Sequence, residues 1–494
     1  MPILILLDIM EVDTLSRIQF ALTAGFHFLF PPITIGLSLF IVLIEAMFLR
    51  SGREIYKIAA KFFLKLFAVI FAIGVVTGIV LEFEFGTNWP VYSRFVGDVF
   101  GSPLAIEAVF AFFMESIFLG IAIWGWNRLG KKSHFVSTLL MCIGTHLSAV
   151  WIIAANSFMQ TPAGFELQYE TPGGIVEVLP DSAVPDKFQI PSTRTVITDF
   201  WDMAFSASMM DRFLHTISAS WLCGAFFALG VCGYMLLRKP DARFGAPCAR
   251  VALVYAAVAA VFMMFTGHGS ARLLAQTQPE KLSAFEGHYK TSKNAPLYIF
   301  GWVDEDSRHV SGLKAKGLFS LLAYGSFDKE VKGLEDLPSD EFLAKIHPGA
   351  SKPALADIRP DYWPPVNFCF QTFRAMVYLG GLIGAFIVWG FGLWIMNELF
   401  DMKKRRARIF WKAAMFSTLL PVAASQFGWA AAEVGRQPWI VWHVLKTSDA
   451  VTTAAAPEEI LFSIILFSLI FTAIAVLGCW VLYKKIVDFN GGEA

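Results

Sequence analysis

The sequence predicts an all-α polytopic membrane protein with nine transmembrane helices. Of its 494 residues, 56% are hydrophobic and only 16% are charged, whereas soluble proteins average roughly 25% charged residues. The mean hydropathy is +0.57. Apolar runs long enough to cross a bilayer, about 20 residues each, recur along the chain. The nine expected helices are 18–49, 62–82, 104–126, 135–157, 214–237, 249–267, 373–396, 409–432 and 459–482.

The connections between these helices alternate in charge. Lysine and arginine cluster after the first, third, fifth, seventh and ninth helices, most densely in K-K-R-R-A-R at 403–408. Because cytoplasmic connections carry the excess of basic residues, we expect the N-terminus outside (periplasmic) and the C-terminus in the cytoplasm.

Two long connections fall on the outer side in this topology, at 160–211 and 268–367. Connections this long are usually functional. The expected organisation is therefore helices 1–6 with the first external loop in 1–267, a second external loop in 268–367, and helices 7–9 in 368–494.

One histidine, His27, lies inside the first apolar helix. Such a residue is more often a hydrogen-bonded structural group, but histidine is also a common axial ligand of haem iron. Arg17, at the expected outer end of the same helix, could pair with a haem propionate or a lipid headgroup.

Two carboxylates lie inside the third helix. Glu107 and Glu115 are eight residues apart, which is about 12 Å along a helix axis with a modest angular offset. They could be protonated acids that bond to other helices. Carboxylates stepped along a membrane helix also suit a proton relay, which we favour. His146, in the fourth helix, could extend this polar path with Ser148 and Asn156, or could be a packed structural residue.

The fifth and seventh helices carry a possible haem-ligand pair near the outer face. His215 begins the fifth helix and Met376 lies near the outer end of the seventh. A His/Met pair gives a six-coordinate haem that transfers electrons, although neither residue is persuasive alone. Arg374, two residues before Met376, could bind a propionate.

The eighth helix ends in F-G-W-A-A-A-E-V-G-R-Q-P-W at 427–439. Glu433 and Arg436 are three residues apart and share a face if the helix continues, and Trp429 lies one turn earlier. Gly435 and the following proline are typical of a helix end. This pair could cap the helix, but ionisable groups near membrane depth are usually functional.

In the second external loop, Lys281 and Glu286 are five residues apart, close to the expected membrane surface. An ordinary solvated loop explains them by itself. A quinol headgroup would need an acid and a base at such a position.

Taken together, these residues resemble subunit I of the cytochrome bd-type quinol oxidases. The resemblance covers the whole membrane part and includes L-S-R-I-Q-F-A-L-T-A-G-F-H-F-L-F at 15–30, G-T-N-W at 86–89, P-L-A-I-E-A-V-F-A-F-F-M-E-S at 103–116 and G-W-A-A-A-E-V-G-R-Q-P-W at 428–439. The short second loop is similar to the cyanide-insensitive branch, in which some members carry haem b in place of haem d.

The resemblance implies three haems in this subunit. His215 and Met376 look like the axial ligands of a low-spin haem b. His27 and Glu433 look like the ligands of two high-spin haems, one of them haem b and the other haem d or a second haem b. Which of the two holds the oxygen-binding haem stays open. Arg436 and Trp429 look like neighbours of these haems.

The resemblance also implies an activity. Lys281 and Glu286 look like residues that bind quinol at the outer face, and Glu115 and Glu107 like carboxylates that carry protons from the cytoplasm to the site where oxygen becomes water. The implied partners are a membrane-embedded subunit II and possibly a small single-helix subunit, in the bacterial cytoplasmic (inner) membrane; nucleic acid is not an expected partner.

Two other functions compete with this reading on the residues alone. A proton-coupled transporter could use Glu107, Glu115, Glu433 and Arg436 as relay groups, but it has no use for His27, His215 and Met376. A simple electron-carrying cytochrome b has no use for Glu433 as a ligand.

Overall fold

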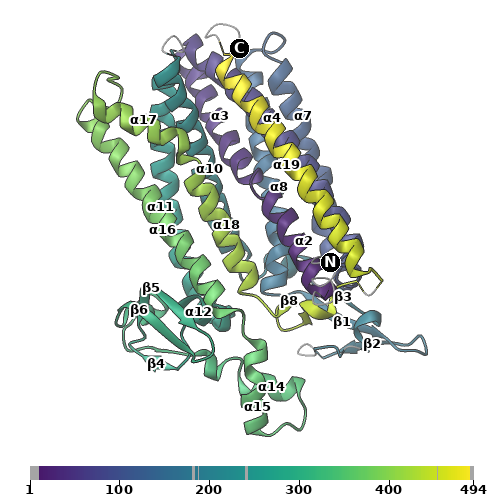
Figure 1. Ribbon diagram of the computed structural model, residues 1–494. Helices are drawn as coiled ribbons and strands as arrows, with labels where there is room; N and C mark the ends of the chain where they lie inside the picture. The colour runs from purple at the N-terminus through teal and green to yellow at the C-terminus, as the bar shows by residue number, and fades with distance from the viewer. Residues whose placement is uncertain (1–10, 181–183, 187, 240–242, 453, 490–494) are drawn as a thin grey trace.

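The computed structural model describes residues 11–180, 184–186, 188–239, 243–452 and 454–489. It is a long bundle of helices with small strands and short helices gathered at one end (Figure 1). The first ten and last five residues, whose sides of the membrane the sequence predicts, lie outside the described residues.

Eight segments of the described chain are long and apolar enough to cross a membrane. They coincide with eight of the nine expected helices, so the polytopic helical fold is confirmed. Their bounds are α2 (Val12–His27) with α3 (Pro31–Ser51), α4 (Glu54–Thr87), α6 (Gly97–Ile106) with the π-helix η1 (Glu107–Phe112) and α7 (Phe113–Trp124), α8 (Lys131–Gln160), α10 (Met209–Arg238), α11 (Gly245–Thr277), α16 (Val366–Ile395) and α19 (Pro457–Val487).

The remaining expected helix, 409–432, is two helices in the structure, α17 (Arg405–Ser417) and α18 (Leu419–Val434). The break has a local cause. Pro421 has no backbone N–H, so the carbonyl of Ser417, four residues earlier, loses its helical donor. The expected first helix is interrupted in the same way, because Pro31 follows His27 by four residues.

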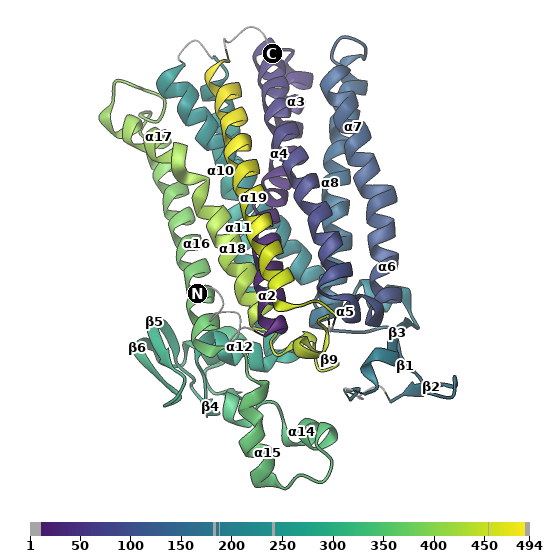
Figure 2. The ribbon, with the colours of Figure 1, turned by 45° about the vertical axis from the view of Figure 1, so that its right-hand side comes forward.

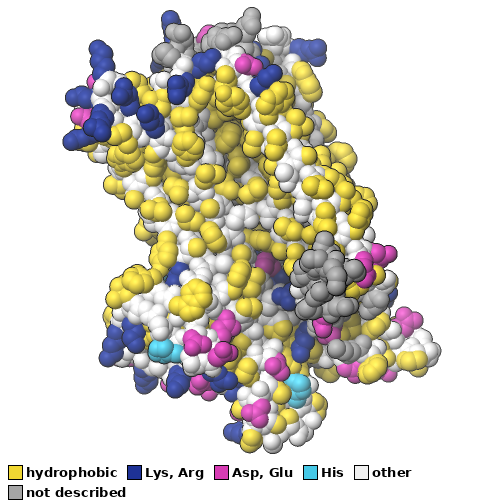
Figure 3. Space-filling model, in the orientation of Figure 1, with side chains coloured by type: hydrophobic (Ala, Val, Ile, Leu, Met, Phe, Trp, Pro, Cys, Tyr) yellow, Lys and Arg dark blue, Asp and Glu magenta, His cyan; other side chains and the backbone are white. Residues whose placement is uncertain are grey.

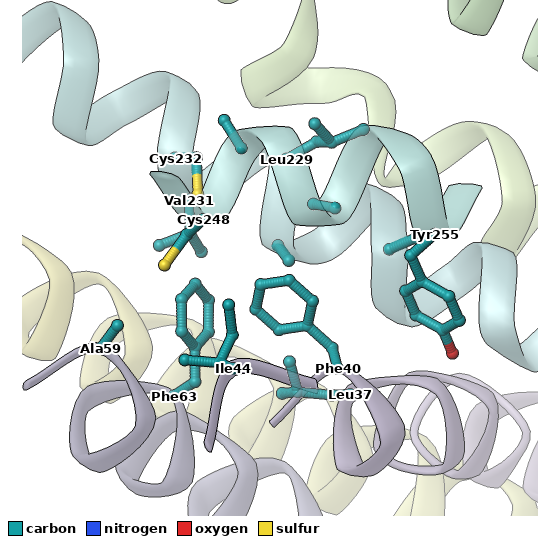
Figure 4. Close-up of a cluster of buried hydrophobic side chains, with 14 of the residues drawn as sticks. Leu37, Phe40, Ile44, Ala59, Phe63, Leu229, Val231, Cys232, Cys248 and Tyr255 are labelled. Atoms are coloured by element: carbon teal, nitrogen blue, oxygen red, sulfur yellow. The ribbon is translucent and has the colours of Figure 1, made fainter. Parts of the chain in front are cut away.

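The centre of the bundle is the contact of α3 with α10. A methyl group at Gly36 would lie 2.0 Å from the backbone oxygen of Ser220, and one at Gly224 would lie 2.1 Å from the backbone of Gly36. Small residues are what allow membrane helices to approach this closely. Beside this contact, side chains of α3 and α4 meet those of α10 and α11 in a buried apolar cluster that includes Phe40 and Phe63 (Figure 4).

The strands and short helices lie at the end of the bundle where α11 ends and α16 begins (Figures 1 and 2). The 160–211 connection forms an antiparallel sheet in the order β2-β1-β3, and the antiparallel pairs β4-β7, β5-β6 and β8-β9 are separate. The elements are α5 (Pro90–Phe95), β1 (Phe165–Glu170), β2 (Val176–Leu179), η2 (Ile190–Ser192), β3 (Thr193–Ile197), α9 (Phe200–Ala204), α12 (Pro279–Glu286), β4 (Ser292–Lys293), β5 (Leu297–Asp304), β6 (His309–Ala315), α13 (Leu318–Tyr324), β7 (Glu330–Val331), η3 (Leu334–Asp336), α14 (Asp340–Ile346), α15 (Lys352–Ile358), η4 (Arg359–Tyr362), β8 (Trp439–Val441), β9 (Leu445–Lys446) and η5 (Thr447–Asp449).

The visible surface divides along the bundle. Hydrophobic side chains cover its middle, and Lys and Arg side chains gather at the end that carries the start of α17 (Figure 3). The opposite end, around α12, α14 and α15, shows acidic and basic side chains together. The apolar middle is what a lipid-facing surface requires, since lipid offers no hydrogen bonds to polar groups.

Because of the α3–α10 contact, we expect the stability of the fold to depend strongly on having glycine at position 36. In Gly36→Ala, the methyl group would overlap the backbone of α10, and overpacking of this kind typically lowers the free energy of unfolding by about 1–3 kcal/mol. We expect a lower Tm in detergent. Gly384→Ala on α16 is the matched control, because a methyl group there meets no atom within 4 Å. Equal Tm values for the two variants would contradict this account of the core.

Candidate functional site

The carboxylate of Glu433, near the end of the bundle that carries α12, accepts hydrogen bonds at both of its oxygens. Its Oε2 accepts from Nη2 of Arg436 at 2.6 Å. Its Oε1 accepts from Nδ2 of Asn156 at 3.1 Å and from Nε2 of Gln160 at 3.2 Å. Nη2 of Arg212 lies 3.8 Å from the same Oε1. Donors from α8, α10 and the end of α18 therefore meet at one carboxylate.

The end of α18 is built for a close approach by α12. The helix stops at Val434 with Gly435 as its C-terminal cap, as the sequence predicts. A methyl group at Gly435 would lie 2.9 Å from Cγ of Lys281 and 3.0 Å from Cε1 of Phe285. The glycine therefore lets two side chains of α12 rest on the helix end, beside Glu433.

Positive charge exceeds negative charge around Glu433. Arg212, Lys281 and Arg436 are close enough to act on this one carboxylate. Three buried N–H groups have no partner in the described residues: Nε and Nη1 of Arg436, and Nε of Arg212. Buried donors without acceptors destabilise a fold, so the cluster suits an anionic group such as a haem carboxylate.

Arg212 was missed by the sequence reading. It lies three residues before His215, in D-R-F-L-H, where a basic residue at the start of a membrane helix ordinarily indicates an interfacial position. The sequence indicated Asn156 only as a possible extension of the polar path at His146, and did not indicate Gln160. Both lie at the end of α8, and only the folded chain brings them to Glu433, more than 270 positions away.

His27 lies at the last residue of α2, where Pro31 interrupts the helix. Its Nδ1 is 3.0 Å from Oγ1 of Thr77 on α4, and a methyl group at Gly78 would lie 3.2 Å from its Cε1. Trp429 of α18 packs nearby, with its ring centroid 6.4 Å from that of Phe28. The structure therefore brings the His27 and Trp429 segments together.

His215 and Met376 contact different helices. Nδ1 of His215 is 3.3 Å from Oγ1 of Thr266 on α11. The sulfur of Met376 lies against α18, where a methyl group at Gly428 would be 2.8 Å from Sδ. None of the described hydrogen bonds or packing contacts joins the two side chains, so their pairing stays a prediction.

The hydrogen bonds of the histidines differ in an informative way. In His27 and His215, the described hydrogen bond is to Nδ1 of the ring. In His134 both ring nitrogens are hydrogen-bonded, one to Glu45 and the other to a backbone carbonyl. Both ring nitrogens of His146 are also hydrogen-bonded, to other partners. Metal-ligating histidines usually bond through one nitrogen to the protein and offer the other to the metal. The hydrogen bonds of His146 favour the packed structural role over the polar path, and its role stays a prediction.

Glu107 is the first residue of the π-helix η1, and Glu115 lies just beyond the end of η1, in α7. Eight residues of regular α-helix would leave their side chains about 80° apart. The extra residue that a π-helix takes up reduces this to about 20°. Both carboxylates face α8: Glu107 accepts from Oγ of Ser148, and Glu115 accepts from Oγ1 of Thr145 at 2.9 Å. The two acids therefore share one face, better aligned than the spacing alone indicates.

Lys281 and Glu286 both lie on α12 and are buried, with 1% and 4% exposed area, but they are not partners of each other. Nζ of Lys281 donates to Oε1 of Gln160 and, at 2.7 Å, to Oε1 of Gln278. Burial lowers the pKa of Lys281 well below its ordinary value.

Glu286 is paired with Arg374, whose Nη2 lies 2.8 Å from Oε2. Burial raises the pKa of Glu286 to about 7, and the guanidinium of Arg374 opposes this rise. Arg374 also donates to the backbone carbonyls of Phe285 and Tyr298. Arg17, in contrast, is exposed and lies 3.9 Å from Asp13. The expected roles of these two arginines beside haem stay predictions.

These features define a multi-pass membrane protein with a charged, buried site at one end. Comparison with known proteins places it more closely. Residues 15–489 match the family described as cytochrome bd terminal oxidase subunit I. The chain is 36% identical over 476 residues to the cytochrome bd ubiquinol oxidase subunit 1 of Bacillus subtilis, covering 96% of this chain and 93% of that protein.

Two further similarities agree. The chain is 32% identical over 520 residues to the cytochrome bd-II ubiquinol oxidase subunit 1 of Escherichia coli, covering 96% of each. The structure of the bd oxidase from Geobacillus thermodenitrificans matches with a TM-score of 0.81 and 28% identity, covering 97% of this chain and 99% of that chain.

The chain belongs to the cytochrome bd terminal oxidase subunit I family. It is thus a subunit of a respiratory membrane oxidoreductase, its family implies haem cofactors, and its place as subunit I implies further subunits. Membership of this family excludes the two alternative functions, a proton-coupled transporter and a simple electron-carrying cytochrome b.

Proposed function

We propose that the chain oxidises quinol beside α12 on the outer membrane face and reduces oxygen to water within the bundle, using protons from the cytoplasm. The observation that carries this proposal is the cluster at Glu433, where the carboxylate lies beside buried arginine N–H groups that have no partner among the described residues. The gathering of Lys and Arg at the α17 end supports the orientation with α12 outside (Figure 3).

The donor set fits three haems. His215 and Met376 would hold a low-spin haem b, and His27 and Glu433 would hold two high-spin haems, one of them haem b and the other haem d or a second haem b. A neutral imidazole with Nδ1 bonded to a threonine hydroxyl is oriented to ligate through its other nitrogen. When bound, the haems supply electron transfer and oxygen reduction.

The positively charged residues would compensate the haem carboxylates. Arg436 and Arg212 have buried N–H groups for this role that lack a partner among the described residues. Trp429 would be a further neighbour of the haems, as the family resemblance implies. Arg17 and Arg374 would lie near other haem carboxylates, as the family resemblance implies.

The two carboxylates of the third span would carry protons inward. Thr145 and Ser148, three residues apart on α8, present hydroxyl groups to Glu115 and Glu107. A hydroxyl group both donates and accepts a hydrogen bond, so each can hold a proton between neighbours. Alignment on one face sets the two acids in sequence along the helix.

Quinol oxidation requires a base for the hydroxyl proton. Glu286 meets this need, since burial raises its pKa to about 7 against the influence of Arg374, and a base works best near its operating pH. Lys281 would act on the same substrate from the other end of α12. With its protons released outside, the reaction would generate a proton motive force.

The segment between α11 and α16 would be a short quinol loop of the type found in the cyanide-insensitive branch. The implied partner is a membrane-embedded subunit II, with a small single-helix subunit as an optional addition, in the bacterial cytoplasmic (inner) membrane. The exposed apolar surface of the bundle is compatible with both lipid and such a partner (Figure 3).

Met376→Leu tests the low-spin assignment. Leucine keeps the volume of the side chain but removes the sulfur ligand. We expect the low-spin haem bands to disappear from the reduced optical spectrum of the purified oxidase while the high-spin bands remain. An intact low-spin spectrum would refute the assignment.

Glu433→Ala tests the high-spin assignment, with the low-spin haem as the internal control. Loss of the carboxylate should remove or disturb one high-spin haem, and should leave the low-spin bands of His215 and Met376 in place. The readout is the haem content per chain together with the spectrum. A complete haem complement would show that Glu433 only caps the end of α18.

The pH dependence of quinol turnover tests Glu286. Because the carboxylate form accepts the proton, turnover should rise with pH through about 7. Glu286→Gln should remove this rise of turnover with pH and slow quinol turnover about 100-fold. Oxidation of an artificial donor should persist.

Arg374→Gln is the matched variant for this profile. Since the guanidinium of Arg374 lowers the pKa of Glu286, its loss should move the rise of quinol turnover to higher pH. A profile that is the same in both variants and the parent enzyme would show that Glu286 is not the base.

A further inference from the structure

A chain of hydrogen bonds connects α12 to Glu433 through Gln160. Nζ of Lys281 donates to Oε1 of Gln160. Nε2 of the same amide donates to Oε1 of Glu433 at 3.2 Å. A primary amide has an acceptor oxygen and two donor hydrogens, so Gln160 can serve both charged groups at once.

Gln160 is held firmly in this position. It is the last residue of α8 and its side chain has 0% exposed area, so bulk water cannot replace either bond. Its backbone carbonyl accepts from Nε2 of Gln278 at 2.9 Å, and Oε1 of Gln278 accepts from Lys281 at 2.7 Å. Side chain and backbone are therefore both tied to the segment that begins α12.

Lys281 itself does not contact Glu433 in any described hydrogen bond or ion pair. Its aliphatic stem packs on Gly435 at the end of α18, and its ammonium group reaches Gln160 and Gln278. The amide of Gln160 is thus the link between the ammonium group and the carboxylate.

We propose that Gln160 is a positioning residue that fixes the Glu433 carboxylate and couples it to the hydrogen bond that Lys281 donates. The hydrogen bond accepted on the oxygen side of the amide polarises its N–H groups and strengthens the bond to Glu433. A carboxylate that accepts stronger hydrogen bonds donates less electron density to iron and is a weaker ligand. Residues that hydrogen-bond to a metal ligand thereby alter the properties of the metal. The quinol-side helix thereby influences the haem that Glu433 holds.

This inference rests on the proposed role of Glu433 as a haem ligand, and the test separates the two. The variants are Gln160→Glu and Gln160→Leu in the purified oxidase with its partner subunits. Glutamate keeps the size of the side chain and an acceptor for Lys281 but has no N–H for Glu433. Leucine removes both bonds.

The measurement is a spectroelectrochemical titration of each haem, with kcat and KM for quinol. Both variants should shift the midpoint potential of the high-spin haem at Glu433 to more negative values, because a carboxylate with fewer donors stabilises ferric iron. Loss of such a supporting bond typically lowers activity by about 10-fold or more, here in kcat. The potential of the low-spin haem should not move.

Gln278→Leu is the matched control. Like Gln160, Gln278 accepts a hydrogen bond from Lys281, and it also donates one to the backbone of Gln160. It makes no described bond to Glu433, so the midpoint potential of the high-spin haem should keep its parental value. Lys281→Met should shift that potential in the same direction as the Gln160 variants, but less.

A high-spin potential that is unchanged in both Gln160 variants, or changed equally in Gln278→Leu, would overturn the positioning role. If Glu433→Ala meanwhile loses a high-spin haem, the proposed function stands without the inference. If Glu433→Ala keeps every haem, the proposed function itself fails.

Discussion

The partly buried carboxylate of Glu433, whose side chain is 17% exposed, constrains much of this structure. A charged group away from water must be met by hydrogen-bond donors, or its burial opposes folding. The donors here come from α8 through Asn156 and Gln160, and from the end of α18 through Arg436. Since Gln160 also binds Lys281 of α12, the position of α12 depends on the same carboxylate.

The helices deviate from regular geometry near the proposed functional residues. The break at His27 follows from Pro31, and the break before α18 follows from Pro421. The π-helix beside Glu107 turns both carboxylates of that span toward α8. Proteins commonly depart from ideal local structure at functional sites. In this chain, the π-helix places Glu107 and Glu115 on the face that meets α8.

Much of the fold could be predicted from sequence because membrane spans follow from length and hydropathy alone. The eighth expected helix, 409–432, shows the limit: its hydropathy is continuous, but the missing N–H of Pro421 divides it. Glu433 and Arg436 could be identified because charge is conspicuous at the end of an apolar run.

The partners of these residues could not be predicted in the same way. Asn156, Gln160 and Arg212 are ordinary polar residues at helix ends, and their meeting with Glu433 depends on how distant helices pack. Likewise, the five-residue spacing of Lys281 and Glu286 suggested one pair, but in the structure Glu286 is bonded to Arg374 on another helix. Sequence separation does not record such contacts.

The most direct test of this account is a cryo-electron microscopy structure of the purified oxidase with its haems bound. The account predicts that a carboxylate oxygen of Glu433 ligates a haem iron, while Gln160 still joins that carboxylate to Lys281, and that Arg436 and Arg212 contact haem carboxylates. A Glu433 that remains paired with Arg436, with no iron at either oxygen, would contradict it.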